Sequence, residues 1–420
     1  MAFFRFLLKH ERRLILILVA ASLAAGVLYS ARLGGDLRYP DERDYLTLAR
    51  NMLSLHMMSR NGVDPTAFRP PGYPVLLCWV LLPGGGVVAA RILNFTAMAM
   101  CLWLLFLLCR SQASAPAGLL AVVFALGYPV LFYTAGTLYP QTVAACLFLG
   151  ILCLCFLAPE LRAPHAAAAG ALFGVLILTV PTFVFTLAFV CVWLVCTRGK
   201  HGAKAAAVVL AVTLAVMSPW LLRNHMLFDR FVFVSTNGGR NLLIGNSANT
   251  TPNSGVNVNI APYEPVVPLD EAERSRHYAR RAMEFVRAHP FHAARLYALK
   301  FLNYFNFRNR LYVRQESSGL RDAVMLLTYG GLLCLAVLRV VFHRRFPLSQ
   351  YERFALALYV LNGAFAAVFF TRIRFRLPFD WLLVSVGAVW LQAHRCSGFT
   401  PARPRRSRMT RSRNSGLPTT

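Results

Sequence analysis

Several continuous apolar runs of about 20 residues restrict the fold of this chain more than any other feature. About 20 residues of helix cross a hydrocarbon core of about 30 Å, and backbone groups in lipid must be satisfied within a helix or a closed barrel. The runs do not alternate between apolar and polar residues, so helices are favoured over barrel strands. Hydrophobic residues make up 57% of the chain, above the ~45–50% of soluble domains. The chain is predicted to be an all-α polytopic membrane protein.

Basic residues gather in the short segments between these runs and at both ends. The net charge of +27 therefore follows the positive-inside rule, and no nucleic-acid partner is predicted. About ten spans are expected, at 13–32, 86–108, 117–133, 141–158, 166–180, 182–197, 204–221, 323–342, 354–371 and 376–393. The protein is expected in the inner (plasma) membrane of the cell. Alternation along these spans puts both termini in the cytoplasm and two long segments outside.

This alternation divides the chain into four regions. Residues 1–221 form a predicted N-terminal transmembrane module, which contains a first outer loop at 33–85. Residues 222–321 combine turn residues with a mixed-charge helical stretch and are interpreted as a small outer domain. Residues 322–394 form a C-terminal transmembrane module, and the basic residues 395–420 are interpreted as a disordered cytoplasmic tail.

The first outer loop concentrates carboxylates in a chain that has only 17 acidic residues. Pro40 followed by acids is a helix-start signal. Apolar residues then recur at helical spacing, which predicts an amphipathic helix on the membrane surface. Their place near a helix N-terminus, together with nearby arginines as partners, is enough to explain Asp36, Glu42 and Asp44 without a catalytic role. Asp41 is singled out by a wider pattern.

Five stretches, in order along the chain, carry that pattern. They are PDERDYLTLARNML (40–53), FRPPGYPVLL (68–77), ARILN (90–94), STNGGRNLLIGN (235–246) and RIRFRLPFDWLL (372–383). Together they resemble family 39-type glycosyltransferases of the C superfamily (GT-C), the group of protein O-mannosyltransferases and aminoarabinose transferases. The resemblance implies a GT-C-like fold and inverting transfer of a hexose or pentose from a polyprenyl-phosphate donor to an acceptor hydroxyl on a lipid, glycan or protein. Relatives often carry a glutamate in a turn after the third span, where this chain has Tyr139-Pro140-Gln141, so the second carboxylate of a two-acid mechanism is not supplied there.

The resemblance also implies roles for particular residues. Asp41, with Glu42 beside it, is the candidate base, since the reaction needs a carboxylate to take the acceptor's proton. A helix N-terminus lowers a carboxylate pKa, which opposes that role. Cations must stabilise the departing phosphate, and arginine presents a planar fork to phosphate oxygens. The candidate substrate-binding residues are Arg374, Arg372, Arg376, Arg69, Tyr45, Tyr73, Asn237 and Tyr139.

Purely structural roles also remain open for these residues. Outward arginines also snorkel at membrane interfaces, tyrosines form interfacial belts, and Asn-Gly pairs form turns. The histidines and cysteines show no ligand spacing, so no cofactor is predicted; a divalent metal stays open but unsupported. The alternative function is a transporter or flippase of lipid-linked sugars. Transporters tend to carry mid-membrane ionisable residues and internal repeats, whereas Arg339 and Asp380 here lie near predicted span ends.

Overall fold

The computed structural model describes residues 2–158, 161–308 and 319–396. Regular structure in these ranges is helical, apart from one isolated bridge between Ser59 and Pro65. The helices up to the outer segment are α1 (Ala2–Leu33), α2 (Pro40–Ser54), α3 (Gly72–Leu81), α4 (Val87–Gln112), α5 (Ala115–Leu126), α6 (Pro129–Ala135), α7 (Gln141–Leu157), α8 (Ala163–Thr179) and α9 (Phe183–Phe228). They are followed by α10 (Asn237–Gly245), α11 (Glu271–Ala288), α12 (Pro290–Tyr304), α13 (Gly319–Met325), a π turn (Leu326–Gly330), α14 (Gly331–Val341), α15 (Gln350–Val368) and α16 (Ile373–Cys396).

The apolar runs fold as helices, and the prediction of a multi-pass helical protein is supported. Within the described ranges, four helices are long and apolar enough to cross a membrane: His10–Leu33, Val87–Gln112, Phe183–Phe228 and Gly319–Arg344. Helices α5 and α6 are bent by 68° relative to each other and count as a fifth candidate only when they are taken together as one broken span. The expected number of about ten spans is not confirmed. One reason is length, because α7 and α8 have 17 residues each, against the ~20 that a span needs.

Helix α9 joins two predicted spans, 182–197 and 204–221, and is broken between them. Gly199 has φ 55° and ψ −132°, a left-handed φ that glycine adopts without steric cost. A Cβ on Gly202 would lie 1.9 Å from the carbonyl oxygen of Leu194. Residues eight apart in a straight helix are about 12 Å apart, so the two halves of α9 fold back on each other at this turn.

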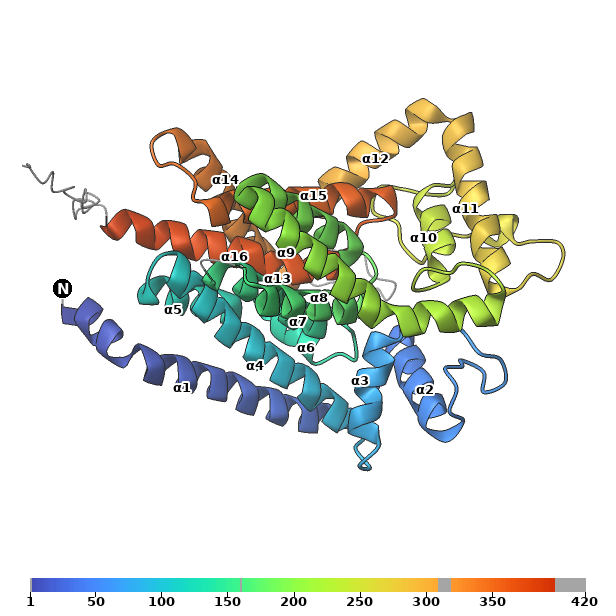
Figure 1. Ribbon diagram of the computed structural model, residues 1–420, viewed down its shortest axis with the longest axis horizontal. Coiled ribbons are helices and arrows are strands. Elements are labelled where there is room, and N and C mark those ends of the chain that lie inside the picture. Colours follow the sequence, from blue (N-terminus) through green and yellow to red (C-terminus); the bar gives the residue numbers. More distant parts are fainter. Residues whose placement is uncertain (1, 159–160, 309–318, 397–420) are drawn as a thin grey trace, which may run out of the picture.

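Helix α16 lies in the centre of the bundle. It packs against α4, α5, α7, α14 and α15, and its side chains from Leu377 to Val389 are mostly buried. Figure 1 shows α10, α11 and α12 grouped at one end of the bundle, the end that also holds α2 and lies away from the N-terminus. Both segments predicted to be outside therefore meet at one end. Residues 397–420, which hold most of the predicted basic tail, are outside the described ranges.

Helix α2 begins at Pro40, as the helix-start signal predicts. Its apolar side packs on protein: Tyr45, Leu46 and Ala49 form one buried cluster with Tyr73 and Leu77 of α3. The helix is amphipathic, but this face is covered by α3 rather than lying on lipid. The polar side of the first turn is left facing the space beneath α10 and α11.

Candidate active site

A cavity of about 1610 Å³ lies between α2 and the outer helices. Its wall draws on the start of α2, the loop at 60–69, the turn before α7, the end of α9, α10, α11 and the start of α16. These segments are far apart in sequence. The described lining includes eight arginines and seven carboxylates, so the chemistry of the cavity depends on which of these charged groups are already paired.

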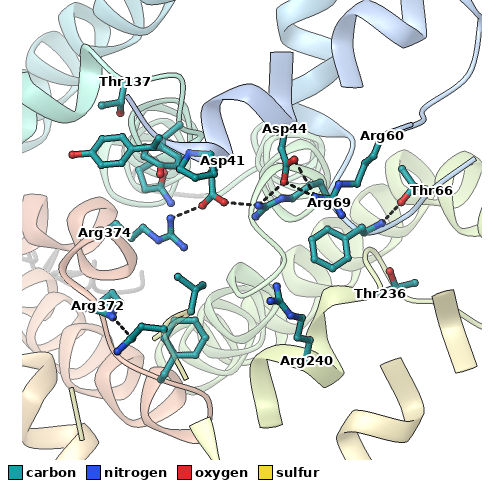
Figure 2. Close-up of a pocket in the computed structure, with 18 of the residues that line it drawn as sticks. Asp41, Asp44, Arg60, Thr66, Arg69, Thr137, Thr236, Arg240, Arg372 and Arg374 are labelled. Atoms are coloured by element: carbon teal, nitrogen blue, oxygen red, sulfur yellow. Dashed lines mark hydrogen bonds and ion pairs between the residues drawn. The ribbon is translucent and has the colours of Figure 1, made fainter. Parts of the chain in front are cut away.

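Asp41 lies on this wall between two arginines. One carboxylate oxygen accepts from Arg69 Nη2 at 2.5 Å and the other from Arg374 Nη1 at 2.6 Å. Figure 2 shows the two guanidinium groups approaching Asp41 from opposite sides. Burial raises the pKa of Asp41, but the charges of Arg374 and Arg69 outweigh burial and hold the pKa below its ordinary value. Asp41 is therefore an ionised carboxylate in an accessible cavity.

Arg69 and Arg374 come from two of the sequence motifs. Arg69 also bonds Asp44 at 3.0 Å, and Asp44 in turn pairs with Arg60 at 3.1 Å. Arg374 lies over the ring of Tyr139, with 5.5 Å from its central carbon to the ring centroid. Arg374 thus joins the first outer loop, the turn before α7 and the start of α16.

Glu42 has a different environment from Asp41. It is 1% exposed and does not line the cavity. One of its oxygens accepts from the backbone N–H groups of Arg38 and Tyr39 at 2.7 and 2.8 Å, and the other accepts from Leu138 N–H at 2.9 Å. Glu42 therefore caps α2 and ties its start to the turn before α7.

Arg376 is separated from Arg374 by two positions and faces the opposite side of α16. It is 0% exposed and pairs with Asp380 at 3.0 Å, and it donates to the carbonyls of Tyr304 and Asn306 at 2.7 and 2.8 Å. Two helical positions rotate a side chain by about 200°. The structure thus separates the arginines that the motif places together, leaving Arg372 and Arg374 on the cavity wall.

The remaining candidates lie around the cavity at different depths. Tyr139 and Arg372 line it, and Arg372 donates to Asn257 at 3.2 Å. Tyr45 and Tyr73 are buried beneath it, in edge-on contact with their centroids 5.3 Å apart. Asn237 begins α10 and accepts from Ser235 Oγ at 3.0 Å, a local contact. Among these five, the structure brings Tyr139 and Arg372 to the cavity that Asp41 also lines.

The ARILN motif (90–94) holds the turn before α7 in place through hydrogen bonds to its backbone. Arg91 Nε donates to the carbonyl of Gly136 at 3.1 Å, and Asn94 Nδ2 donates to that of Thr137 at 2.6 Å. With Glu42 on Leu138 N–H, three buried side chains fix the turn that presents Tyr139. Each of these bonds satisfies a buried backbone group.

Two residues of the outer segment that are not among the predicted site residues also line the cavity. Glu271, at the start of α11, accepts from Thr66 Oγ at 2.6 Å, from Ala67 N–H at 3.1 Å and from the hydroxyl of Thr236. It therefore fastens the first loop to the outer helices. Arg240 of α10 points into the cavity (Figure 2). Glu271 lies in none of the motifs, whereas Arg240 lies within STNGGRNLLIGN (235–246), and the motif itself does not show that this side chain faces the cavity.

The described residues offer no cluster of three or more His, Cys, Asp and Glu side chains arranged to hold a metal. Gln141, which follows Tyr139 and Pro140 and begins α7, also lines the cavity. Its Oε1 has no hydrogen-bond partner among the described residues. The cavity therefore presents Asp41 and Arg374 together with a neutral amide from the start of α7.

No family model and no curated protein matches the chain. Among solved structures, it is similar to the oligosaccharyltransferase of Archaeoglobus fulgidus in the apo form, with TM-score 0.51 and 14% identity over 90% of this chain and 52% of that one. ArnT from Cupriavidus metallidurans bound to undecaprenyl phosphate gives 0.44 and 14%, over 92% and 77%. Archaeal AglB with an inhibitory peptide and a dolichol-phosphate gives 0.44 and 11%, over 92% and 52%. The first of these likenesses supports a GT-C-like fold, and this chain spans about half of that oligosaccharyltransferase.

Proposed function

We propose that this protein is a membrane glycosyltransferase that moves a sugar from a polyprenyl-phosphate donor to an acceptor hydroxyl on the extracytoplasmic side. One observation carries the proposal: Asp41, an ionised carboxylate, is held between Arg69 and Arg374 in a large cavity at one end of a helical bundle. A carboxylate base beside phosphate-binding cations is the set of groups that this transfer requires. The GT-C-like fold agrees with it.

The proposed step is an inverting displacement. The acceptor's hydroxyl proton passes to an Asp41 oxygen as the acceptor oxygen bonds to the anomeric carbon of the sugar. The bond between that carbon and the donor's phosphate oxygen breaks, and its electron pair leaves with the phosphate. Arg374 then stabilises the charge that develops on the leaving group.

Arg374 also offers a way to activate Asp41. In the structure it bonds the carboxylate and keeps the pKa of Asp41 low, which makes a weak base. A donor phosphate that engages Arg374 draws this cation away and leaves Asp41 with Arg69 alone. The pKa of Asp41 then rises towards its ordinary value, so the base becomes stronger once the donor is bound.

The other candidates divide by position. Arg372 and Tyr139 are proposed to contact the substrates, because both line the cavity. Glu42, Arg376, Tyr45 and Tyr73 are proposed to position the site from beneath it. Asn237 is proposed to shape the start of α10, near the cavity-lining Thr236.

The test compares envelope glycans and lipids among three strains: a deletion strain, one complemented with the wild-type gene and one complemented with Asp41→Asn. We expect one glycan or glycolipid to be lost on deletion, restored by the wild type and still missing with Asp41→Asn. Mass spectrometry of lipids that copurify with the protein gives a second readout, in which Arg374→Gln is expected to retain less polyprenyl phosphate. An unchanged glycan profile with altered uptake of lipid-linked sugars would point to the transporter instead.

A further inference from the structure

A second cavity, of about 240 Å³, lies at the opposite end of the bundle. Its wall comes from the ends of α4, α7 and the first half of α9 and from the start of α15. Helix α7 connects the two cavities, since Gln141 lines the large one and Ala158, just after its end, lines the small one. At about 1.5 Å per residue they are roughly 25 Å apart. Alternation of the predicted spans puts this end on the cytoplasmic side.

Arg198 is the one charged side chain among the described residues that line this cavity. Its Nη2 donates to the carbonyl of Cys155 at 2.7 Å, near the end of α7. Its Nη1 is buried and has no hydrogen-bond partner among the described residues. A buried charged donor left without an acceptor is unfavourable, because its lost hydration is not replaced. An acceptor from outside the chain is therefore expected at Nη1.

The backbone turn explains why Arg198 faces inward. It immediately precedes Gly199, where α9 reverses direction. Lys200, two positions on, is exposed and does not line the cavity. The turn thus directs one cation into the bundle and leaves the next in solvent.

The other ten described residues of the wall are uncharged, and four of them are aromatic. Phe354 contacts Phe156 and Trp193 edge-on, with ring centroids 5.0 and 5.3 Å apart. Gln112 and the exposed Gln350 supply amides. With no carboxylate on the described lining, nothing there competes with an incoming anion for Arg198.

We propose that this cavity binds the phosphate of an anionic membrane lipid through Arg198. The volume is below the ~300 Å³ of small drug sites, so it suits a headgroup phosphate rather than a whole lipid. Basic pockets between helices on the cytoplasmic side are suited to anionic headgroups, which are concentrated in that leaflet. The inference does not depend on the proposed glycosyl transfer.

The experiment measures lipid retention by the full-length protein after exchange into phosphatidylcholine vesicles with or without phosphatidylglycerol. Native mass spectrometry is expected to show bound phosphatidylglycerol on the wild type. Arg198→Gln, which retains a donor for the Cys155 carbonyl, is expected to lower retention roughly 10-fold or more, since hydrogen bonds to charged groups contribute about 1.5–3 kcal/mol. Arg198→Lys should be intermediate. The matched control is Lys200→Gln, which removes the same charge two positions away and should stay near the wild type.

Three results would overturn the proposal. The first is equal retention by Arg198→Gln and Lys200→Gln. The second needs no variant: the wild type shows no preference for phosphatidylglycerol over phosphatidylcholine. The third is thermal stabilisation by inorganic phosphate in detergent, dependent on Arg198, without lipid retention, which would assign the site to free phosphate.

Discussion

Two arginine–carboxylate pairs at the start of α16 have opposite surroundings. Arg374 reaches across to Asp41, and their side chains are 30% and 22% exposed. Arg376 pairs with Asp380 within the same helix, and both side chains are 0% exposed. The two arginines are separated by two positions, so the direction each faces, rather than its sequence neighbourhood, decides whether it meets the cavity or the core.

The difference also lies in how completely each pair is satisfied. Asp380 accepts from the hydroxyls of Tyr128 and Tyr359 at 2.9 and 3.0 Å in addition to Arg376. Arg376 lies over the ring of Tyr329, 3.5 Å from its centroid. This pair has no free face for a ligand and stabilises a junction of helices. The cavity pair lies on the wall of the cavity, where we propose that a phosphate reaches Arg374.

The largest expected effect is on turnover, and it should come from the cavity pair rather than from the buried pair. Asp41→Asn removes the proposed base and should lower turnover about 10²–10⁴-fold, with little change in thermal stability. Asp44→Asn is the control, since Asp44 lies on the same helix and shares Arg69; its turnover should change far less. Rates of sugar transfer and melting temperatures of both variants test whether Asp41 is the base. Near-normal turnover of Asp41→Asn would remove Asp41 from the mechanism.

Breaking the buried pair should act on stability. Arg376→Gln leaves Asp380 without its cation, and losing one partner of a buried pair costs about 3–5 kcal/mol. Unfolding in detergent measures this loss. Replacing both partners, with Arg376→Met and Asp380→Leu, should recover part of it, because apolar substitutes avoid burying a charge. A double variant no more stable than Arg376→Gln would contradict this account.

A smaller effect is expected at Glu42, beside the proposed base. Glu42→Gln cannot accept all three backbone N–H groups, and a buried donor left unpaired costs about 1–3 kcal/mol. The melting temperature should fall accordingly. Asp36→Asn is the matched control, because the described residues give the Asp36 carboxylate no hydrogen-bond partner. Equal melting temperatures for the two variants would argue against Glu42 as the support of this turn.

The smallest effect concerns pH. Because the pKa of Asp41 is held below its ordinary value, Asp41 stays ionised above about pH 4. Any stability it contributes is present above that pH and is lost only as pH falls through the lowered pKa. The acid limb of kcat/KM for Asp41 should therefore lie below pH 4. In Arg374→Gln the limb should move up, since one cation no longer lowers the pKa; an unmoved limb would contradict the coupling.

The sequence predicted the class of fold, and it predicted part of the candidate site, for physical reasons. Apolar runs identify membrane helices, and Pro40 with its acids marks the start of α2. The motifs also indicated Asp41, Arg69 and Arg374, which the structure brings together. The ten-span count was not confirmed, because run length alone does not settle whether helices as short as α7 cross a membrane.

Other features depend on tertiary packing that local sequence does not encode. The opposite directions of Arg374 and Arg376 become predictable only if α16 is known to begin at Ile373 rather than at 376. Glu271 and Arg240 reach the cavity because α10 and α11 fold over the first loop. Their roles are set by partners such as Thr66, 205 positions from Glu271.

The 333 positions between Asp41 and Arg374 also have a consequence for biogenesis. At about 5–20 residues per second, translation reaches Arg374 roughly 15–70 s after Asp41. During that interval Asp41 emerges with Arg69 alone, and the pair that we propose to handle phosphate does not exist. On the proposed function, transfer therefore cannot begin until α16, the last described helix, has been made and has brought Arg374 to Asp41.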